Sequence, residues 1–203
     1  QYKAYNIGNG LSPTNNAWRV IADNSQHIWC ASPIHPLVRL NTQTGQWEGM
    51  KDEQGDHIYG MDFRLDRRGN LLIASTYGLV IHDNKTGKTR RYTTNLSGTQ
   101  EMKVKTAVAL CYDAKRDLLL MGHKQGLTLF DLQHDHLYYI ENTPNRVDIS
   151  VKSIEQDRQG IFWLSTANGI SRLNVEQKKD GTLQWSIKNY APREGQITPF
   201  FNG

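Results

Sequence analysis

The sequence predicts an all-β fold made of repeated four-stranded antiparallel units. Three observations support this: a unit of similar sequence recurs four times, turn residues fall at fixed places in each copy, and no segment keeps an apolar period of 3.6 residues. A period of about 40–45 residues with four strands in each copy is typical of the blades of a β-propeller. We therefore expect about four propeller blades and almost no helix.

Each copy is anchored by an aspartate that opens a stretch of similar sequence. "DRQGIFWLSTANGISRLN" begins at Asp157 and "DRRGNLLIASTYGLVIHD" begins at Asp66, and the two stretches align without a gap. The copies that begin at Asp113 and Asp23 carry one extra residue, which we place in their second turn. The four aspartates lie 43, 47 and 44 residues apart.

Each copy is expected to hold four strands joined by three turns. The first strand ends at the aspartate, where an Asp-x-x-Gly segment favours a tight turn, because Asp bonds its own downstream backbone and Gly accepts a positive φ. The second strand carries Trp29 or Trp163, which we expect in the core, with Leu72 and Leu119 at the matching places. A short turn leads to the third strand, and a Thr-Gly or Asp-Gly turn leads to the fourth.

The expected blades cover residues 10–50, 51–93, 94–140 and 141–190. Residues 1–9 are predicted to be the outer strand of a preceding blade, and residues 191–203 the start of a next one. Because an unpaired blade edge is prone to aggregation, we expect the chain to be a segment of a larger ring. Two alternatives remain: a closed ring of four blades, and a ring of eight blades that a second chain completes.

Composition excludes several classes of partner and site. The 24 basic and 20 acidic residues are interspersed, so the net charge of +4 forms no basic face for nucleic acid. No apolar run reaches the ~20 residues of a membrane span. Cys30 and Cys111 lie in strand-like runs and are expected to be buried free thiols. A disulfide between them is the alternative. We expect no metal site and no cofactor, and we interpret His134-Asp135-His136 as an exposed turn.

The stretches "GLSPTNNAWRVIADNSQHIWCAS" and "SVKSIEQDRQGIFWLSTANGISRLN" resemble the two-component regulator propeller repeat. The Gly-Leu-Ser start, the Asp-x-x-Gly turn and the tryptophan of the second strand carry the resemblance. It covers nearly the whole chain and is strongest in the first and fourth copies. The second and third copies depart from the pattern at Leu72 and Leu119, and the first at Pro36. The tail "YAPREGQITPFFNG" is similar to the phrase that follows later blades in this family.

The resemblance implies a role and a setting for the chain. Such repeats build seven-bladed propellers in the periplasmic sensor region of hybrid two-component histidine kinases from gut Bacteroidetes. It implies an oligosaccharide ligand, control of genes for polysaccharide utilisation, contacts with the rest of the sensor ectodomain and a homodimer of the full-length protein. The kinase domains and the membrane attachment lie outside this chain, which we expect not to be an enzyme itself.

Candidate binding residues come from the end of the propeller where the connections into the first strands meet the second turns. Sugar sites combine apolar walls with a few placed polar groups. Tyr77 could stack on a sugar ring, and Lys124 could bond a hydroxyl, a carboxylate or a sulfate. The full set of expected ligand-binding residues is Trp18, His35, Tyr77, His123, Lys124 and Asn168.

Two other classes of function stay open. A propeller enzyme, acting on glycans or resembling quinoprotein dehydrogenases, is suggested by the Thr-Gly turns that precede Trp47 and Tyr92. A protein-interaction scaffold like the WD-repeat propellers is the other, although the Trp-Asp signature is missing. Catalysis has little support, because neither Gly-x-Ser-x-Gly nor His-Glu-x-x-His occurs. The four anchor aspartates are expected to serve turns and not as an acid–base pair.

Overall fold

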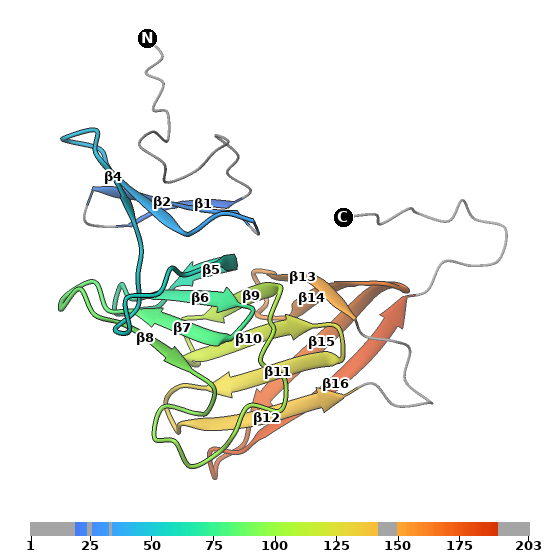
Figure 1. Ribbon diagram of the computed structural model, residues 1–203. Helices are drawn as coiled ribbons and strands as arrows, with labels where there is room; N and C mark the ends of the chain where they lie inside the picture. The colour runs from blue at the N-terminus through green and yellow to red at the C-terminus, as the bar shows by residue number, and fades with distance from the viewer. Residues whose placement is uncertain (1–18, 24–25, 33, 142–149, 191–203) are drawn as a thin grey trace, which may run out of the picture. The chain divides into compact units, whose positions relative to one another are not determined.

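A computed structural model describes residues 19–23, 26–32, 34–141 and 150–190 of the chain. These residues form sixteen strands in four antiparallel four-stranded sheets, and no helix occurs among them (Figure 1). The predicted all-β architecture of four-stranded units is therefore confirmed. The strands expected in residues 1–9 and 191–203 lie outside the described residues.

Every sheet is a meander, so strands that follow one another in sequence also pair. The first sheet consists of β1 (Arg19–Ala22), β2 (His27–Ala31), β3 (Val38–Asn41) and β4 (Trp47–Gly49). The second consists of β5 (Gly60–Leu65), β6 (Leu71–Ser75), β7 (Gly78–His82) and β8 (Thr89–Tyr92). The third consists of β9 (Ala109–Asp113), β10 (Leu118–His123), β11 (Gly126–Asp131) and β12 (His136–Glu141). The fourth consists of β13 (Val151–Gln156), β14 (Phe162–Thr166), β15 (Gly169–Gln177) and β16 (Leu183–Tyr190).

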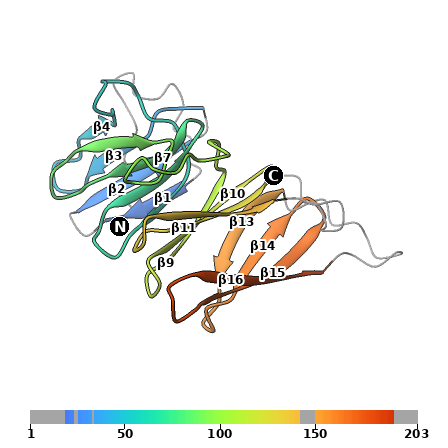
Figure 2. The ribbon, with the colours of Figure 1, turned by 90° about the horizontal axis from the view of Figure 1, so that it is seen from below.

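The chain divides into two compact units, Gln1–Thr93 and Thr94–Gly203, each with two sheets. Within the first unit β5 lies beside β1 and β2. Within the second unit β13 lies beside β9 and β10 (Figure 2). Trp29 of the first sheet shares a core with Phe63 and Ile73 of the second. Leu120 of the third sheet shares a core with Phe162 of the fourth. In each unit, therefore, two sheets pack face to face through their apolar side chains.

The anchor aspartates form the turns that their spacing predicts. The Asp157 carboxylate accepts hydrogen bonds from the backbone N–H groups of Gln159 and Ile161, at 2.9 and 3.0 Å, and Gly160 has φ +82°. The same carboxylate accepts the indole N–H of Trp163 at 2.9 Å, and this hydrogen bond lowers the pKa of Asp157. The turn and the second strand are thus tied together by one side chain.

The two tryptophans of the second strands differ in burial. Asp23 accepts the indole N–H of Trp29 at 2.8 Å, and Trp29 is fully buried, as expected for a core residue. Trp163 makes the same hydrogen bond but is only partly buried, so placing it in the core was wrong.

The extra residue of the third copy lies in its first turn, not in the second as the sequence alignment placed it. In the third copy Asp113 pairs with Leu118, and the turn between them has four residues. In the second copy the backbone N–H of Asp66 bonds the carbonyl oxygen of Asn70, and the turn between them has three residues. Asp117 takes the left-handed conformation, with φ +52°, at a turn position that Gly69 and Gly160 fill in the second and fourth copies and Gln26 in the first. The second strand is therefore shifted by one residue, and Leu120, not Leu119, is the structural equivalent of Trp163.

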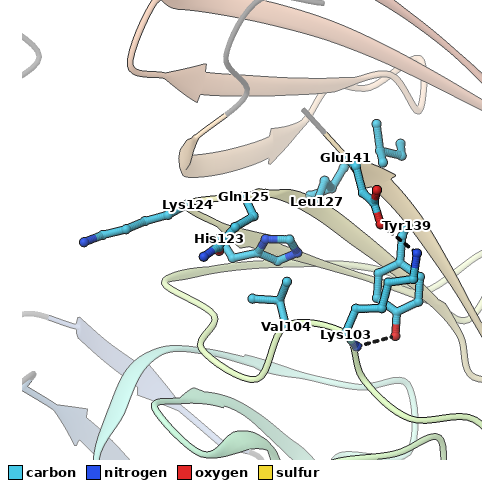
Figure 3. A pocket seen from close by; sticks show the side chains of 9 residues that line it. Lys103, Val104, His123, Lys124, Gln125, Leu127, Tyr139 and Glu141 are labelled. Carbon is cyan, nitrogen blue, oxygen red and sulfur yellow. Dashed lines mark hydrogen bonds and ion pairs between the residues drawn. The ribbon is translucent and has the colours of Figure 1, made fainter. Parts of the chain in front are cut away.

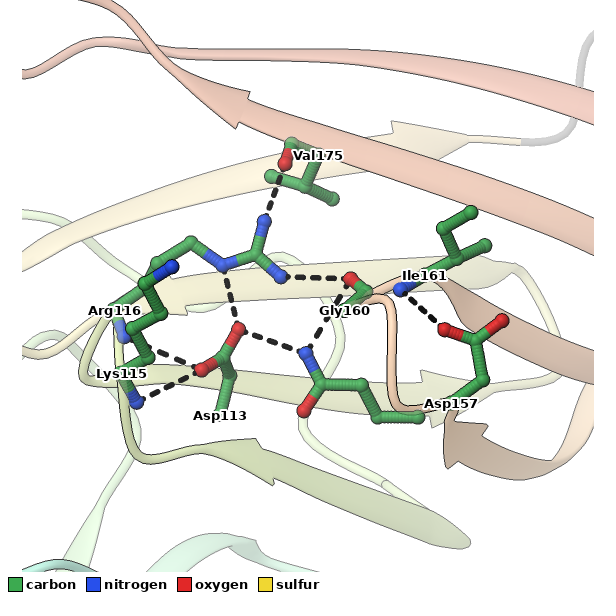
Figure 4. A network of polar contacts seen from close by, with 8 residues as sticks. Asp113, Lys115, Arg116, Asp157, Gly160, Ile161 and Val175 are labelled. Carbon is green, nitrogen blue, oxygen red and sulfur yellow. Dashed lines mark hydrogen bonds and ion pairs between the residues drawn. The ribbon is translucent and has the colours of Figure 1, made fainter.

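Arg116 joins the third sheet to the fourth (Figure 4). Its Nε lies 2.5 Å from Asp113 Oδ2, and its guanidinium also donates to the carbonyl oxygens of Gly160, at 3.1 Å, and Val175. Gln156 donates to the same Asp113 oxygen at 2.9 Å. Burial by itself raises the pKa of Asp113, but the hydrogen bonds from Gln156 and Arg116 outweigh it and hold that pKa below its usual value. A buried carboxylate is thus paired from both sheets at once.

Neither Cys30 nor Cys111 takes part in a disulfide, and both are buried, as expected. Burial raises the pKa of Cys30 to about 11, so this thiol stays protonated and unreactive at neutral pH. Among the residues that the structure describes, none forms a helix long and apolar enough to cross a membrane.

Candidate functional site

A pocket of about 460 Å³ lies at one end of the third sheet (Figure 3). Its lining comes from the segment that leads into this sheet (residues 103–104), from the end of β10 and the turn that follows it (residues 123–125), from Leu127 and from the end of β12 (residues 139–141). A connection into a first strand and a second turn thus meet at one end of the sheet. The volume lies within the range of about 300–1,000 Å³ that small-molecule sites occupy.

The connecting segment, which we define as residues 94–104, is held by the buried side chain of Asn95. The Asn95 Oδ1 accepts the backbone N–H groups of Thr99 and Gln100, and its Nδ2 donates to the Asp135 carbonyl oxygen at 2.8 Å. The Asp135 carboxylate in turn accepts the N–H groups of Leu96 and Ser97. Burial by itself raises the pKa of Asp135, but a hydrogen bond from the Ser97 side chain and these two backbone bonds outweigh it and hold that pKa below its usual value.

The connecting segment also covers the outer edge of the third sheet. The Gln100 side chain accepts the N–H of Leu137 at 2.8 Å and donates to its carbonyl oxygen at 2.7 Å, as a neighbouring strand would. Leu137 lies in β12, the last strand of the sheet, and an uncovered edge of this kind is a site for unwanted pairing. The segment that shapes one wall of the pocket is therefore fixed to the sheet by hydrogen bonds from the Gln100 side chain to the backbone of β12.

One wall of the pocket carries Lys103, Tyr139 and Glu141. Lys103 Nζ lies 2.6 Å from Glu141 Oε1 and 5.0 Å from the centre of the Tyr139 ring. The Tyr139 hydroxyl accepts the backbone N–H of Lys103 at 3.0 Å and donates to the Glu101 carbonyl at 2.8 Å. The hydrogen bond to Glu141 raises the pKa of Lys103, so the ammonium stays charged at neutral pH. Because Lys103 and Glu141 are exposed, their pair adds little to stability and is open to exchange with a ligand.

His123 forms a neutral part of the pocket lining. Its side chain is buried, and Nε2 shares a hydrogen bond of 3.0 Å with the hydroxyl of Thr128. Burial lowers the pKa of His123 to about 4, so the imidazole is uncharged at any physiological pH. Its Nδ1 has no hydrogen-bond partner among the described residues. The ring is therefore an uncharged part of the lining that keeps one unpaired ring nitrogen.

The structure brings together only two of the six residues predicted for ligand binding. His123 and Lys124 line the same pocket, although Figure 3 shows the Lys124 ammonium pointing away from Lys103 and Glu141. Asn168 is exposed in the turn between β14 and β15 and does not line this pocket. Trp18 lies outside the described residues.

The other two predicted residues belong to the first unit. His35 is partly buried in the turn after β2. Tyr77 is exposed in the turn between β6 and β7, and the Arg91 guanidinium lies 5.3 Å from the centre of its ring. Arg91 also pairs with the buried Asp52 at 2.6 Å, so one face of Tyr77 is already in contact with a fixed cation.

Sequence reasoning missed Lys103, Tyr139 and Glu141, although a signal for the segment that positions them exists. Asn95 is followed three residues later by Gly98, and Asp52 by Gly55, so two Asx-x-x-Gly segments lie 43 residues apart. The Asp52 carboxylate accepts the N–H groups of Gln54 and Asp56, as Asn95 does for its own loop. This second repeated turn marks connecting segments that fold back on the sheet they lead into.

The chemistry that the pocket offers is recognition by shape and hydrogen bonds. Val104, Leu127 and Ile140 are the apolar residues of the lining, of which Leu127 and Ile140 are almost fully buried, and the Lys103–Glu141 pair offers a donor and an acceptor side by side. Within the described ranges there is no cluster of three or more His, Cys, Asp or Glu side chains that could hold a metal ion. A ligand with several hydroxyl groups and an apolar ring face matches such a lining.

Comparison with known proteins adds information at the level of the fold. No model of a known protein family matches the sequence, and no curated protein matches it either. The structure is similar to the extracellular domain of a protein described as a hybrid two-component system from Bacteroides thetaiotaomicron, with a TM-score of 0.66 and 18% identity over 91% of this chain and 28% of that one.

Two further structures are similar. The extracellular domain of a protein described as a one-component system from the same species gives a TM-score of 0.64 and 20% identity, over 79% of this chain and 22% of that one. The WD40 β-propeller domain of Doa1 gives a TM-score of 0.55 and 13% identity, over 81% of this chain and 52% of that one. The four sheets are therefore blades of a β-propeller, as predicted. The chain spans only 22–28% of the length of the two Bacteroides ectodomains.

Proposed function

We propose that this chain is a ligand-sensing segment of the periplasmic region of a hybrid two-component sensor histidine kinase, and that its ligand is an oligosaccharide. The observation that carries the proposal is the structural similarity to the extracellular domains of Bacteroides signalling proteins. The sequence resemblance to the two-component regulator propeller repeat supports the same assignment independently of the coordinates. The kinase, the membrane attachment and the dimer contacts would lie elsewhere in the longer protein.

The pocket of the third blade is the proposed ligand site. The ring of Tyr139 and the neutral His123 supply a surface for a sugar face, and the Lys103–Glu141 pair supplies exchangeable hydrogen bonds for hydroxyl groups. One of its walls comes from a connecting segment that is fixed to the edge of the sheet, so a ligand meets a preformed site. Signalling would follow if the ligand binds one arrangement of the sensor better than another. The response would be control of genes for polysaccharide utilisation.

A binding function suits the described residues better than catalysis does. The carboxylates of Asp23, Asp66, Asp113 and Asp157 are all engaged in turn hydrogen bonds. Such carboxylates are held in place by backbone N–H groups, which suits a structural role and not proton transfer to a substrate. We therefore propose no catalytic activity for this chain.

Calorimetric titration of the chain with a panel of oligosaccharides from plant, host and microbial polysaccharides tests the proposal. We expect heat of binding with at least one member of the panel. The Lys103→Ala variant should weaken that binding about tenfold, which corresponds to about 1.4 kcal/mol. Lys179→Ala, in the exposed turn between β15 and β16, is the matched control and should bind like the wild type. No heat with any oligosaccharide, or turnover of one of them, would count against the proposal.

A further inference from the structure

A second pocket, of about 370 Å³, lies at the opposite end of the third sheet from the candidate ligand site. The candidate site opens where β10 ends, whereas this pocket opens at the turn that leads into β10. Its lining comes from the first turns of the third and fourth sheets and from β15, and consists of residues 113, 115–116, 156–160 and 174–175. We call it the turn pocket. All of its lining belongs to one compact unit, so the pocket is formed within that unit.

The two carboxylates of the turn pocket are already bonded within the protein. Asp113 Oδ1 accepts the backbone N–H groups of Lys115 and Arg116, at 2.9 and 3.2 Å. Its Oδ2 accepts Arg116 Nε and Gln156 Nε2, so four hydrogen bonds use the full accepting capacity of this carboxylate (Figure 4). Asp157 accepts two backbone N–H groups and an indole N–H. The carboxylates therefore leave little capacity for a bound cation.

The cationic side chains of the turn pocket are not all used in this way. The lining holds three of them, Lys115, Arg116 and Arg158, against two carboxylates, so one positive charge is in excess. Arg116 is committed to Asp113 and to two carbonyl oxygens. Lys115 and Arg158 are exposed, and their charged groups form no hydrogen bond or ion pair with the residues that the structure describes. Two cationic groups, one from each turn, thus border the same pocket without a counter-ion from that part of the chain.

We propose that the turn pocket binds one oxyanion group, a phosphate, a sulfate or a carboxylate, through Lys115 and Arg158. A guanidinium binds such a group with two parallel N–H···O bonds, and an ammonium adds a compact positive charge. The side-chain amide of Gln159, which also lines the pocket, supplies neutral donors. The bound group would contact the first turns of both sheets and so link them, as Arg116 does. This site shares no residue with the candidate ligand site, so the inference does not depend on the proposed oligosaccharide.

The sequence confines this pair of cationic turns to the second unit. In the first unit Asp66 is followed by Arg67 and Arg68, but Asp23 is followed by the uncharged residues 24–25. Only one of the two first turns there carries cations. We therefore expect an oxyanion to bind in the second unit and not at the matching place in the first.

NMR titration of the chain with inorganic phosphate, at an ionic strength held constant with sodium chloride, tests the proposal. Saturable amide shifts are expected at residues 114–116 and 158–160, and none at residues 67–69. Lys115→Gln and Arg158→Gln should each weaken the binding about fivefold, as expected for a charge contact at the surface, and the double variant should abolish it. Lys152→Gln is the matched control, because it removes an exposed cation at the other end of β13 and should bind phosphate like the wild type.

Parallel titrations with sodium sulfate, sodium acetate and glucose 6-phosphate distinguish the sources of the oxyanion. Saturable binding of any of these probes that requires both Lys115 and Arg158 supports the proposal, and the probe that binds most tightly shows whether the group is a free ion or is carried on a sugar. Shifts that do not saturate with any probe, or saturable shifts that persist in the double variant, overturn it. Equal weakening by Lys152→Gln would also overturn it, since the binding would then reflect general attraction to a chain of net charge +4.

Discussion

The buried imidazole of His123 should make the stability of the protein depend on pH below neutrality. Burial lowers its pKa from 6.5 to about 4. Between these values the unfolded chain binds a proton that the folded chain does not, so stability falls as the pH falls. From the two pKa values, the contribution of His123 to the free energy of unfolding should drop by about 2 kcal/mol between pH 8 and pH 5, and by ~3 kcal/mol once the pH is below 4.

Urea unfolding at a series of pH values measures this contribution of His123 to the free energy of unfolding. His123→Gln removes the titrating group, so the difference in unfolding free energy between the wild type and the variant should change by about 2 kcal/mol between pH 8 and pH 5. His57→Gln, at an exposed position, should leave the pH dependence of the wild type intact. Imidazole resonances in NMR spectra give the pKa directly. A pKa of His123 near 6.5, or the same pH dependence in wild type and His123→Gln, would refute the reasoning.

Three further predictions concern contacts within the second unit. Arg116→Met should lower the free energy of unfolding by about 3 kcal/mol, because it leaves the Asp113 carboxylate buried without its cation; Asp113→Asn in the same chain should recover part of the loss, measured by urea unfolding in a double-mutant cycle. Gly122→Ala should cost about 1–3 kcal/mol, since the added Cβ would lie 2.6 Å from Val151 Cγ1, and failure of Val151→Ala to reduce that cost would contradict this cause. Asn95→Ala should release the connecting segment and speed amide hydrogen exchange at both the segment and β12; unchanged exchange at β12 would show that Asn95 does not hold the segment in place.

Much of the fold could be predicted because its signals are local. An aspartate that bonds its own downstream N–H groups, with a glycine at positive φ, is fixed by four or five consecutive residues, and Asp66 and Asp157 behave in this way. The third copy was misaligned because Asp117 adopts a positive φ without being glycine. Because that turn has one residue more, Leu120, and not Leu119, occupies the position in the second strand that matches Trp163.

The candidate site was harder to predict because its contacts are not local. Lys103 meets Glu141 across 38 positions of sequence, and Gln100 bonds Leu137 across 37. His123 was predicted because the sequence places it at the turn between the second and third strands; in the structure it is the last residue of β10, beside that turn, and it lines the pocket. Tyr139 lies in the middle of an outer strand, and nothing in its own sequence shows that a connecting segment will fold back onto it. The difference between Trp29 and Trp163 likewise depends on which sheet covers each, and not on the sequence around them.

Chemical-shift mapping by NMR tests the central claim, that the pocket of the third blade binds an oligosaccharide, most directly. Backbone amide and imidazole resonances of the chain would be followed while each oligosaccharide of the panel is added. The account predicts saturable shifts concentrated in residues 103–104, 123–125 and 139–141, and their loss in Lys103→Ala. Saturable shifts confined to other residues, or no shifts with any member of the panel, would contradict it.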